Sequence, residues 1–310
     1  MTMILANWPL LCTPPAANSI NRSSWLQNVS ILQSSSSVSL PITTISAHRC
    51  CINNKDENTA TTSLEEFSVL KPDNGIDNGN LWSTMALYMF SLHIPLSFGG
   101  LSVVASILGQ SSLDPQTEAV CLLGIQILEL QAVLWGSTYF MKNKTPLFDL
   151  LRIFQPNNNS NLSGERNWVF ASIVGFGFLL LIVFSTSFLA DQLTSSKEVN
   201  NHILKEIVSS GFISKGACVL VYCIITPLLE EIVYRGFLLR SLVSAIGWRG
   251  AVVVSSVVFS LAHFSVEDSL QLFIIGCILG CSYCWSGKLS SPLLIHSLYN
   301  SFILIVTFLA

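Results

Sequence analysis

Long runs of apolar residues, separated by short polar segments, fill the chain from residue 81 onward. About 20 apolar residues in a helix are enough to cross the hydrocarbon core of a bilayer. The pattern therefore predicts an all-α fold, a polytopic bundle of about seven transmembrane helices. The runs lie near residues 81–108, 117–141, 167–190, 212–239, 247–264, 270–286 and 290–310.

Residues 1–54 have a different character, because the first acidic residue of the chain is Asp56. Serine is dense in this segment, and its only basic residues are Arg22 and Arg49. An acid-free, serine-rich start is typical of an organelle transit peptide, and the sparse arginine favours a plastid over a mitochondrion. A disordered tail with no targeting role is the alternative interpretation.

Residues 55–80 are polar and rich in Asn, Asp and Gly, which is typical of a linker. We therefore expect three parts in the chain. A disordered transit peptide occupies residues 1–54, the linker follows at residues 55–80, and a transmembrane helical domain occupies residues 81–310.

Composition agrees with a membrane protein. Hydrophobic residues make up 51% of the 310 positions and charged residues only 11%, whereas soluble domains carry about 25% charge. The net charge of −3 gives no indication of a nucleic-acid partner, so membrane lipids are the expected surroundings. The nine cysteines form no paired CxxC pattern for a metal, and those in apolar runs act as small hydrophobes.

The segment TPLLEEIVYRGFLLR, from Thr226 to Arg240, places ionisable side chains inside an apolar run. A charged side chain at membrane depth costs about 2.5 to 3.5 kcal/mol on insertion scales, so it is kept for a partner or a function. Glu231 and Arg235 are four residues apart and can form an ion pair on one helix face. Glu230 points about 100° away around the helix and has no basic partner on this segment. We interpret Glu230 as a base or proton shuttle; two bracing glutamates are the alternative.

Two later runs also carry polar residues. His263 ends the sequence FSLAHF, four residues after Phe259. His296 and Asn300, in HSLYN, are four residues apart and share a helix face. One histidine within a membrane span is usually a core residue that has its hydrogen bonds satisfied. Two histidines together with Asn300 and an unpaired glutamate favour a common polar site.

The order Glu-Glu-x-x-x-Arg, Phe-x-x-x-His, His-x-x-x-Asn resembles the CAAX prenyl protease type II family, also called the CPBP or abortive-infection membrane protease family. The resemblance covers about the last hundred residues and puts a protease core at about 212–310. It implies that Glu230 and His263 activate a water molecule. It also implies that His296 and Asn300 stabilise the oxyanion, that Glu231 and Arg235 form a structural ion pair, and that Phe259 supports the site.

Zinc is an alternative way to activate the water molecule. Glu230, His263 and His296 offer a carboxylate and two imidazoles, which are ligand types of zinc. We expect the metal-free arrangement and assign no cofactor. If zinc were bound to Glu230, the base would have to be Glu231, which is tied to Arg235.

Three further polar residues lie in the first two runs. Glu118 is expected at the membrane interface, and Glu129 lies inside its span, where it could line a cavity. His93, close to Pro95, is interpreted as the histidine of a kinked helix rather than a ligand. None of the three is assigned to catalysis.

Helix length raises a geometric condition for the site. A rise of about 1.5 Å per residue places Glu230 about 18 Å, His263 about 22 Å and His296 about 9 Å from the same membrane surface. These side chains can meet only if their helices are tilted or staggered. The function we expect depends on that meeting.

The expected function is intramembrane endopeptidase activity in a chloroplast membrane, either envelope or thylakoid. The partner would be a peptide or protein substrate that reaches the membrane, and in the namesake enzymes that substrate is prenylated. A non-catalytic scaffold or regulator that keeps the protease fold is one alternative. A proton-coupled transporter that uses the same acid and histidines is another.

Overall fold

The computed structural model describes residues 67–70, 78–111, 113–140, 166–193, 210–266 and 268–309. The regular elements in these residues are helices. Their bounds are α3 Asn78–Tyr88, η1 Met89–His93, η2 Pro95–Gly99, α4 Gly100–Ile107, α5 Pro115–Phe140, α7 Trp168–Leu193, α9 Phe212–Leu220, η3 Val221–Ile225, α10 Thr226–Glu230, η4 Glu231–Leu239, α11 Arg240–Ala262, α12 Ser269–Ser286 and α13 Ser290–Leu309.

Six helical segments of the described residues are long and apolar enough to cross a membrane. One of them, Phe212–Ala262, is 51 residues long, about twice the length that a bilayer core requires. Its backbone leaves helical dihedral angles at Gly247, where φ is 71° and ψ is 167°, a conformation that favours glycine. The sequence-predicted spans 212–239 and 247–264 are the two parts of this segment, so an all-α bundle of about seven spans is confirmed.

A polar connection was expected between those two predicted spans, but the segment there is helical. The helix continues directly from η4 into α11, which begins at Arg240. No proline interrupts the chain here, and the residues before Gly247 keep a helical backbone. The reversal of chain direction is therefore concentrated at one glycine.

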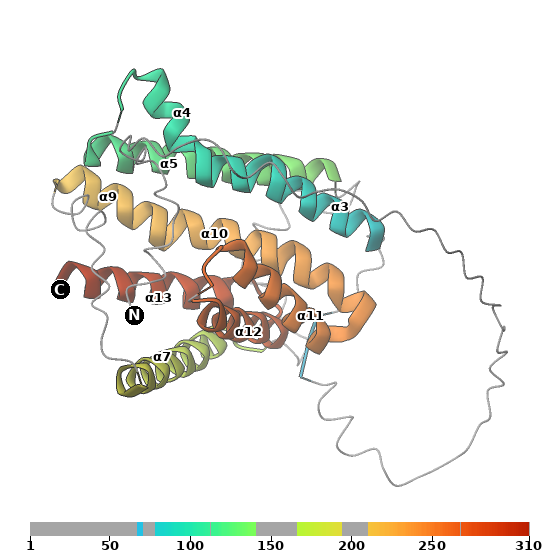
Figure 1. Ribbon diagram of the computed structural model, residues 1–310. Helices are drawn as coiled ribbons and strands as arrows, with labels where there is room; N and C mark the ends of the chain where they lie inside the picture. Colours follow the sequence, from blue (N-terminus) through green and yellow to red (C-terminus); the bar gives the residue numbers. More distant parts are fainter. Residues whose placement is uncertain are drawn as a thin grey trace, which may run out of the picture. The chain divides into compact units, whose positions relative to one another are not determined.

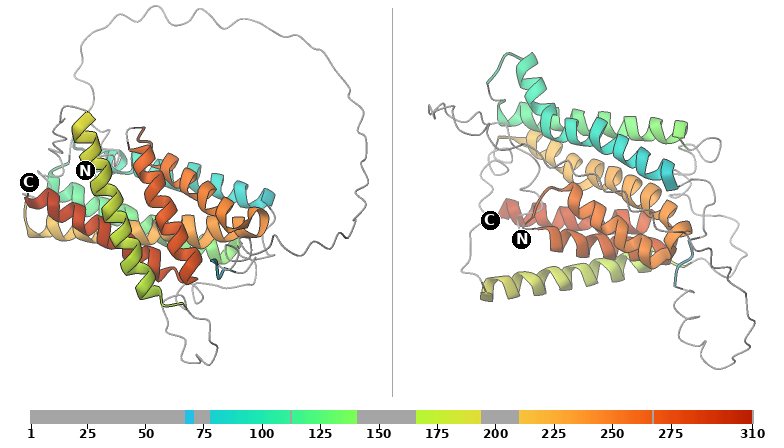
Figure 2. Two further views of the ribbon diagram at one scale, coloured as in Figure 1. Left: turned by 90° about the horizontal axis from the view of Figure 1, so that it is seen from below. Right: turned by 45° about the vertical axis from the view of Figure 1, so that its right-hand side comes forward.

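The helices pack in a definite order (Figures 1 and 2). The α5 helix packs against the α9, η3 and α10 stretch, and this stretch in turn contacts α13. The α11 and α12 helices pack against each other, and α12 and α13 both contact α7. The continuous helix from α9 to η4 thus lies between α5 on one side and α13 on the other. This central helix carries Glu230, Glu231 and Arg235.

Small residues let α11 and α12 approach closely. A Cβ atom added to Gly276 of α12 would lie 2.9 Å from the Cβ atom of Ser256 on α11. One turn later, a Cβ atom on Gly280 would lie 3.2 Å from side-chain atoms of Leu239 and Val252. Glycines four residues apart are a recurrent means of close helix packing in membranes. This close approach sets the position of α12 relative to the central helix.

Four segments have π-helical hydrogen bonds, in which a backbone N–H donates to the carbonyl five residues earlier. Two of them, η1 and η2, flank Ile94 in the first span, where the sequence predicted a proline kink. The other two, η3 and η4, lie before and after α10. π-helical turns are frequent at functional sites, and here they surround the Glu230–Glu231 pair.

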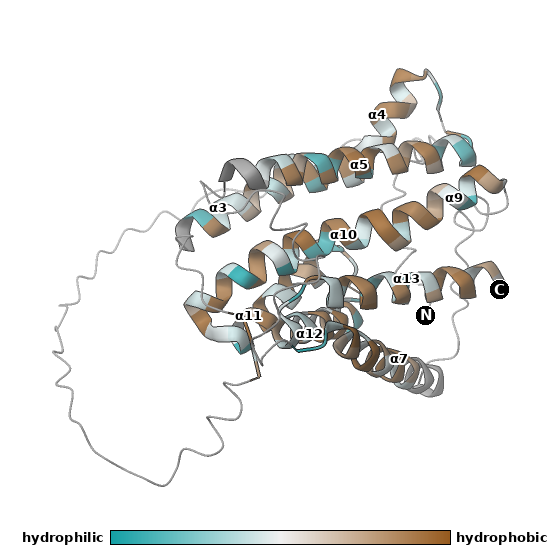
Figure 3. Ribbon diagram, turned by 180° about the vertical axis from the view of Figure 1, so that it is seen from behind, coloured by the Kyte–Doolittle hydropathy of each residue, from teal (hydrophilic) through white to brown (hydrophobic). Residues whose placement is uncertain are grey.

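Hydrophobic residues predominate along the helices, as the colouring of Figure 3 shows, and many large ones are exposed on the bundle surface. Examples of exposed large residues are Ile107, Trp135, Leu181 and Leu261. Such exposure suits contact with lipid rather than water. Many polar residues of the spans, among them Glu129, Glu231 and Arg235, are buried, so the protein is a multi-pass membrane protein with an internal polar region.

The predicted transit peptide at residues 1–54 lies outside the described residues. The same holds for most of the predicted linker at residues 55–80. Of that linker, Phe67 stacks on Trp248 with 4.9 Å between ring centroids, and the Val69 N–H donates to the carbonyl of Cys284 at 3.0 Å. These contacts attach the end of the linker to the bundle.

Candidate active site

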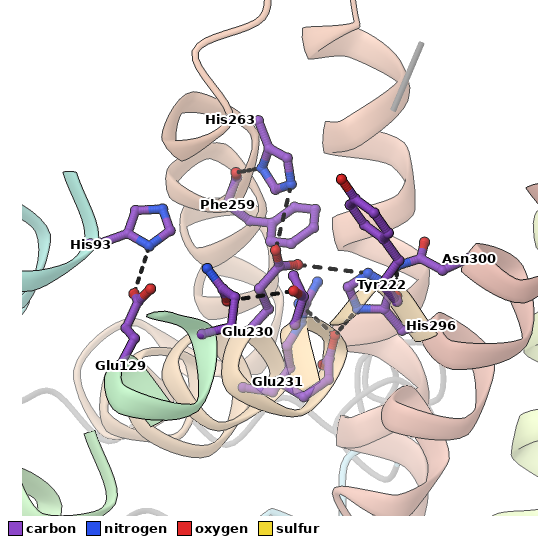
Figure 4. Close-up of polar contacts among 12 residues, drawn as sticks. His93, Glu129, Tyr222, Glu230, Glu231, Phe259, His263, His296 and Asn300 are labelled. Carbon is purple, nitrogen blue, oxygen red and sulfur yellow. Dashed lines mark hydrogen bonds and ion pairs between the residues drawn. The ribbon is translucent and has the colours of Figure 1, made fainter. Parts of the chain in front are cut away.

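The side chains of Glu230, His263 and His296 meet in the interior of the bundle (Figure 4). The Nε2 atom of His263 lies 3.8 Å from Oε1 of Glu230, and the Nε2 atom of His296 lies 3.6 Å from Oε2 of Glu230. Glu230 ends α10, His263 follows α11, and His296 lies in α13. The helices are therefore staggered enough for three residues at different predicted depths to approach one another.

Hydrogen bonds to the Nδ1 atoms fix the orientation of both imidazoles. Nδ1 of His263 lies 2.8 Å from the carbonyl of Phe259, which can only accept, so this nitrogen carries the proton. Nδ1 of His296 lies 2.9 Å from Oε1 of Glu231, and the same reasoning gives it a proton when the carboxylate is ionised. In the neutral imidazoles, both Nε2 atoms are then hydrogen-bond acceptors that face the Glu230 carboxylate.

The Glu230 carboxylate and the two Nε2 atoms are all hydrogen-bond acceptors, so a proton donor is needed between them. Glu230 Oε2 has no hydrogen-bond partner among the residues that the structure describes, although the residue is buried. A carboxylate that faces two imidazole lone pairs is satisfied by a water molecule that donates to them, or by a proton added to one of the three groups. The geometry can therefore hold a water molecule or a shared proton between these three groups.

Glu231 is shared between Arg235 and His296. Its Oε1 atom accepts from Nη1 of Arg235 at 2.9 Å and also contacts Nδ1 of His296 at 2.9 Å. Glu231 is 0% exposed and Arg235 is 1% exposed. The sequence predicted the ion pair from the four-residue spacing, but it did not predict the contact between Glu231 and His296.

Arg235 connects the central helix to α11 and α12. Its Nη2 atom donates to the carbonyl of Gly276 at 3.3 Å. Its guanidinium group lies over the ring of Phe259, 4.6 Å from the centroid, close enough for a cation–π interaction. Phe259 also contacts the rings of His263 and His296, with centroid distances of 4.7 and 6.2 Å. Phe259 thus packs against both imidazoles and the arginine.

Asn300 is oriented by a backbone group of the central helix. Its Nδ2 atom donates to the carbonyl of Tyr222 at 2.9 Å. In the π-helical register of η3, the Thr226 N–H donates to Val221, so the donor expected for Tyr222 would be residue 227. That residue is Pro227, which has no N–H. Pro227 therefore cannot donate to the Tyr222 carbonyl, and Asn300 donates to it.

A second polar cluster, which we call the α5 cluster, consists of Tyr88, His93, Gln126, Glu129 and Thr226. The Tyr88 hydroxyl donates to Oε1 of Glu129 at 2.8 Å, and Nδ1 of His93 lies 2.9 Å from the same oxygen. The Thr226 hydroxyl donates to Oε1 of Gln126 at 3.5 Å. The interpretation of His93 as a mere kink histidine was incomplete, because it contacts Glu129.

Part of this cluster can be recognised from residue spacing. Gln126 stands three residues before Glu129 in an apolar run, which places both on one face of α5. Tyr88 and His93 lie on a different span, so their pairing with Glu129 could not be inferred from spacing. Glu118 lies in the first turn of α5, near the end of the span.

The donor set can be compared with what zinc requires. Among the described residues, no group of three or more His, Cys, Asp or Glu side chains is arranged to hold a metal ion. The Nδ1 hydrogen bonds of His263 and His296 are of the kind that zinc-bound imidazoles make, so Glu230 and the two Nε2 atoms are the ligands that zinc would use. Without zinc, the same three side chains face one another and can hold a water molecule.

A known protein family matches the part of the chain that carries this site. Residues 213–302 match the family model described as type II CAAX prenyl endopeptidase Rce1-like. This range contains all the motif residues from Glu230 to Asn300, so the chain carries an Rce1-like domain within a helical membrane protein.

Similarity to one characterised protein agrees with this family match. The chain is 29% identical over 140 residues to the "Membrane-embedded CAAX protease MroQ" of Staphylococcus aureus (strain USA300). The match covers 43% of this chain and 56% of that protein, so the chain spans about half the length of the relative. No solved structure matches the chain.

Proposed function

We propose that this protein is an intramembrane endopeptidase that hydrolyses peptide bonds with a water molecule activated by Glu230 and His263. The observation that supports this most directly is the buried Glu230 carboxylate between the Nε2 atoms of His263 and His296, at 3.8 and 3.6 Å. The Rce1-like match and the similarity to a CAAX protease support the same reaction class.

The first step would be proton transfer from water. A water molecule that donates to Oε1 of Glu230 and to Nε2 of His263 satisfies two acceptors at once, and its oxygen is directed at the substrate carbonyl. Glu230 takes one proton as the oxygen attacks, which gives the tetrahedral intermediate. Glu230 then transfers that proton to the leaving amine, so that one water and one peptide bond become a carboxylic acid and an amine.

The oxyanion would be stabilised from the α13 side. Asn300 has two N–H groups on Nδ2, and one of them donates to Tyr222, so the other can donate to the oxyanion. His296 can donate from Nε2 only when both ring nitrogens carry protons, because Nδ1 faces Glu231. Once Glu230 has taken the proton, the charges of Glu231, Arg235, His296 and the oxyanion sum to zero, which suits a buried site.

The substrate would be a peptide or protein segment that reaches the membrane. The family description and the relative both carry the CAAX name, so a peptide with a prenylated cysteine followed by three residues is the first substrate to test. A transmembrane or signal-like peptide without a prenyl group is the second. Both reach a buried site from the lipid phase.

The proposed location is a chloroplast membrane, and this part rests on the composition of residues 1–54. Fusion of these residues to a fluorescent protein should direct it to plastids. A cytosolic or mitochondrial signal would contradict this location but would leave the enzymatic proposal unaffected.

The test compares membranes from cells that express either the native chain or Glu230→Ala. Mass spectrometry of the released peptides should find products that depend on Glu230. Identical peptide sets from the two membranes, with equal amounts of both proteins, would count against proteolysis. They would favour a non-catalytic scaffold, for which Glu230→Gln should keep the biological function.

Transport is tested with the same protein in vesicles. A proton-coupled transporter would produce substrate flux that depends on a pH gradient, without a cleaved product. The α5 cluster gives some reason to run this control, because a buried acid–imidazole pair inside a membrane is also found in proton pathways. Cleavage that persists in detergent without any gradient supports the endopeptidase.

A further inference from the structure

Two buried polar atoms on one face of α5 have no hydrogen-bond partner among the described residues. They are Nε2 of Gln126, a donor, and Oε2 of Glu129, an acceptor. Both residues are 0% exposed. An unsatisfied buried polar group costs about 1 to 3 kcal/mol, so such a pair on one helix face indicates a place for a ligand with matching groups.

The other atoms of these side chains are held in place. Oε1 of Glu129 contacts both Tyr88 and His93, and Oε1 of Gln126 accepts from Thr226. The position of Glu129 Oε2 is therefore set by Tyr88 and His93, while the 3.5 Å contact with Thr226 orients Gln126 more weakly. The cluster presents a donor and an acceptor about one helical turn apart, which is about 5 to 6 Å between Cβ atoms.

This face lies next to the proposed catalytic residues. Thr226, which contacts Gln126, precedes Glu230 by four residues on the central helix. Figure 4 shows Glu129 and His93 on the opposite side of Glu230 from His296 and Asn300. A peptide whose carbonyl faces Asn300 would therefore extend across Glu230 toward α5.

The ligand chemistry follows from the membrane setting. A peptide cleaved within a bilayer must be extended at the cut, which removes the hydrogen bonds of its helix. Each unsatisfied N–H or C=O group costs several kcal/mol in lipid. An extended residue presents its own N–H and C=O on the same edge, as in a β ladder. Glu129 Oε2 can accept from that N–H, and Gln126 Nε2 can donate to that C=O.

We propose that Gln126 and Glu129 form a binding subsite for the backbone of an extended substrate residue close to the scissile bond. The subsite would recognise the peptide group itself rather than a side chain, in the manner of strand addition to a sheet edge. This inference rests on the proposed endopeptidase function and extends it to residues outside the matched range 213–302.

The first test uses affinity, separated from cleavage. The probe is a dye-labelled peptide with an S-farnesyl cysteine followed by three residues. In a Glu230→Gln background, Gln126→Leu should weaken binding of the probe about five- to tenfold, the value of one net hydrogen bond. In the active chain the same change should raise KM by a similar factor and leave kcat within about twofold.

Gln131 supplies a matched control, because it is an exposed glutamine on the same helix. Gln131→Leu should leave Kd, KM and kcat unchanged. If the native chain cleaves the probe and Gln126→Leu binds it as tightly as Gln131→Leu does, the subsite is wrong and the proposed function stands. Absence of cleavage of any membrane peptide by the native chain would instead count against the proposed function.

The second test alters the backbone of the probe and compares the native chain with Glu129→Gln. Esters replace single amides in the probe, so that one backbone N–H is removed at a time. At one position near the cut, the native chain should lose about five- to tenfold in affinity. This loss should disappear in Glu129→Gln, where Oε1 stays held by Tyr88 and His93 and the amide places a donor at the Oε2 position. An ester penalty that is identical in the two proteins at every position would overturn the proposal.

Discussion

Nδ1 of His296 lies 2.9 Å from Oε1 of Glu231, the same oxygen that accepts from Arg235. The proposed oxyanion donor and the structural arginine are therefore bound to one buried carboxylate. Glu231 has a part in orienting His296 in addition to its pairing with Arg235. A change at either partner should affect the other through this atom.

The two halves of the ion pair should differ in their effect on stability. In Arg235→Met, Glu231 keeps His296 as a partner. In Glu231→Gln, the amide oxygen can still accept from Arg235, but the buried guanidinium loses the negative charge that offsets its own, and its other described contacts are the Gly276 carbonyl and the Phe259 ring. We expect Glu231→Gln to cost about 3 to 5 kcal/mol and Arg235→Met to cost less, as measured by unfolding in mixed micelles.

The double variant Glu231→Gln/Arg235→Met separates stability from activity. It removes both charges, so its stability should return toward the native value. Its activity should stay low, because His296 has lost the carboxylate that orients it. Equal instability of the two single variants would contradict the shared role of Glu231.

Replacement of Glu230 should impair the reaction without unfolding the protein. Glu230→Gln has almost the same shape, and the histidine contacts at 3.6 and 3.8 Å are too long to be strong direct hydrogen bonds. We expect kcat to fall about 10²- to 10⁴-fold, the usual contribution of a general base, with an unchanged unfolding midpoint. A variant that retains most of its activity would remove Glu230 from the mechanism.

Asn300 and Pro227 should act on the same step. Asn300→Leu removes the proposed oxyanion donor and should lower kcat about 10²- to 10³-fold. Pro227→Ala adds an N–H that can bond to the Tyr222 carbonyl and displace Asn300 from it, so a smaller loss of about fivefold in kcat is expected. In Asn300→Leu, the further change Pro227→Ala should have little effect on kcat. Additive losses would show that the two residues act independently.

The close contact between α11 and α12 can be tested at Gly276. A Cβ atom there would lie 2.9 Å from the Ser256 Cβ atom and 3.1 Å from its Cα atom. Gly276→Ala should therefore cost about 1 to 3 kcal/mol of stability through overpacking. Gly177→Ala on α7 is the control, because nothing lies within 4 Å of the added atom, and it should be neutral or slightly stabilising.

Metal removal should leave peptide cleavage intact. Zinc bound to Glu230 would leave Glu231 as the base, although Glu231 is already engaged by Arg235 and His296. We therefore expect unchanged kcat after dialysis against a strong chelator. Loss of cleavage, together with one zinc ion per chain by elemental analysis and recovery on adding zinc, would reverse this assignment.

Some features of the protein follow from its sequence because they depend on local periodicity. The apolar runs predicted the transmembrane bundle, and the four-residue spacing of Glu231 and Arg235 predicted their ion pair. The existence of two spans within residues 212–264 also followed from the apolar runs, although the expected polar connection between them is a helix that bends at Gly247. Each of these depends on residues that are neighbours along the chain.

The assembly of the site depended on tertiary structure. Helix length alone placed Glu230, His263 and His296 at different depths, and the staggered packing of α10, α11 and α13 brings them together. The contacts of Asn300 with Tyr222 and of Glu129 with His93 join residues on separate helices. Spacing along a chain fixes the face of a helix on which a side chain lies. The partner that the side chain meets is decided by how the helices pack against one another. Between α11 and α12 that packing depends on Gly276 and Gly280. For Asn300, the partner is the Tyr222 carbonyl, to which Pro227 cannot donate.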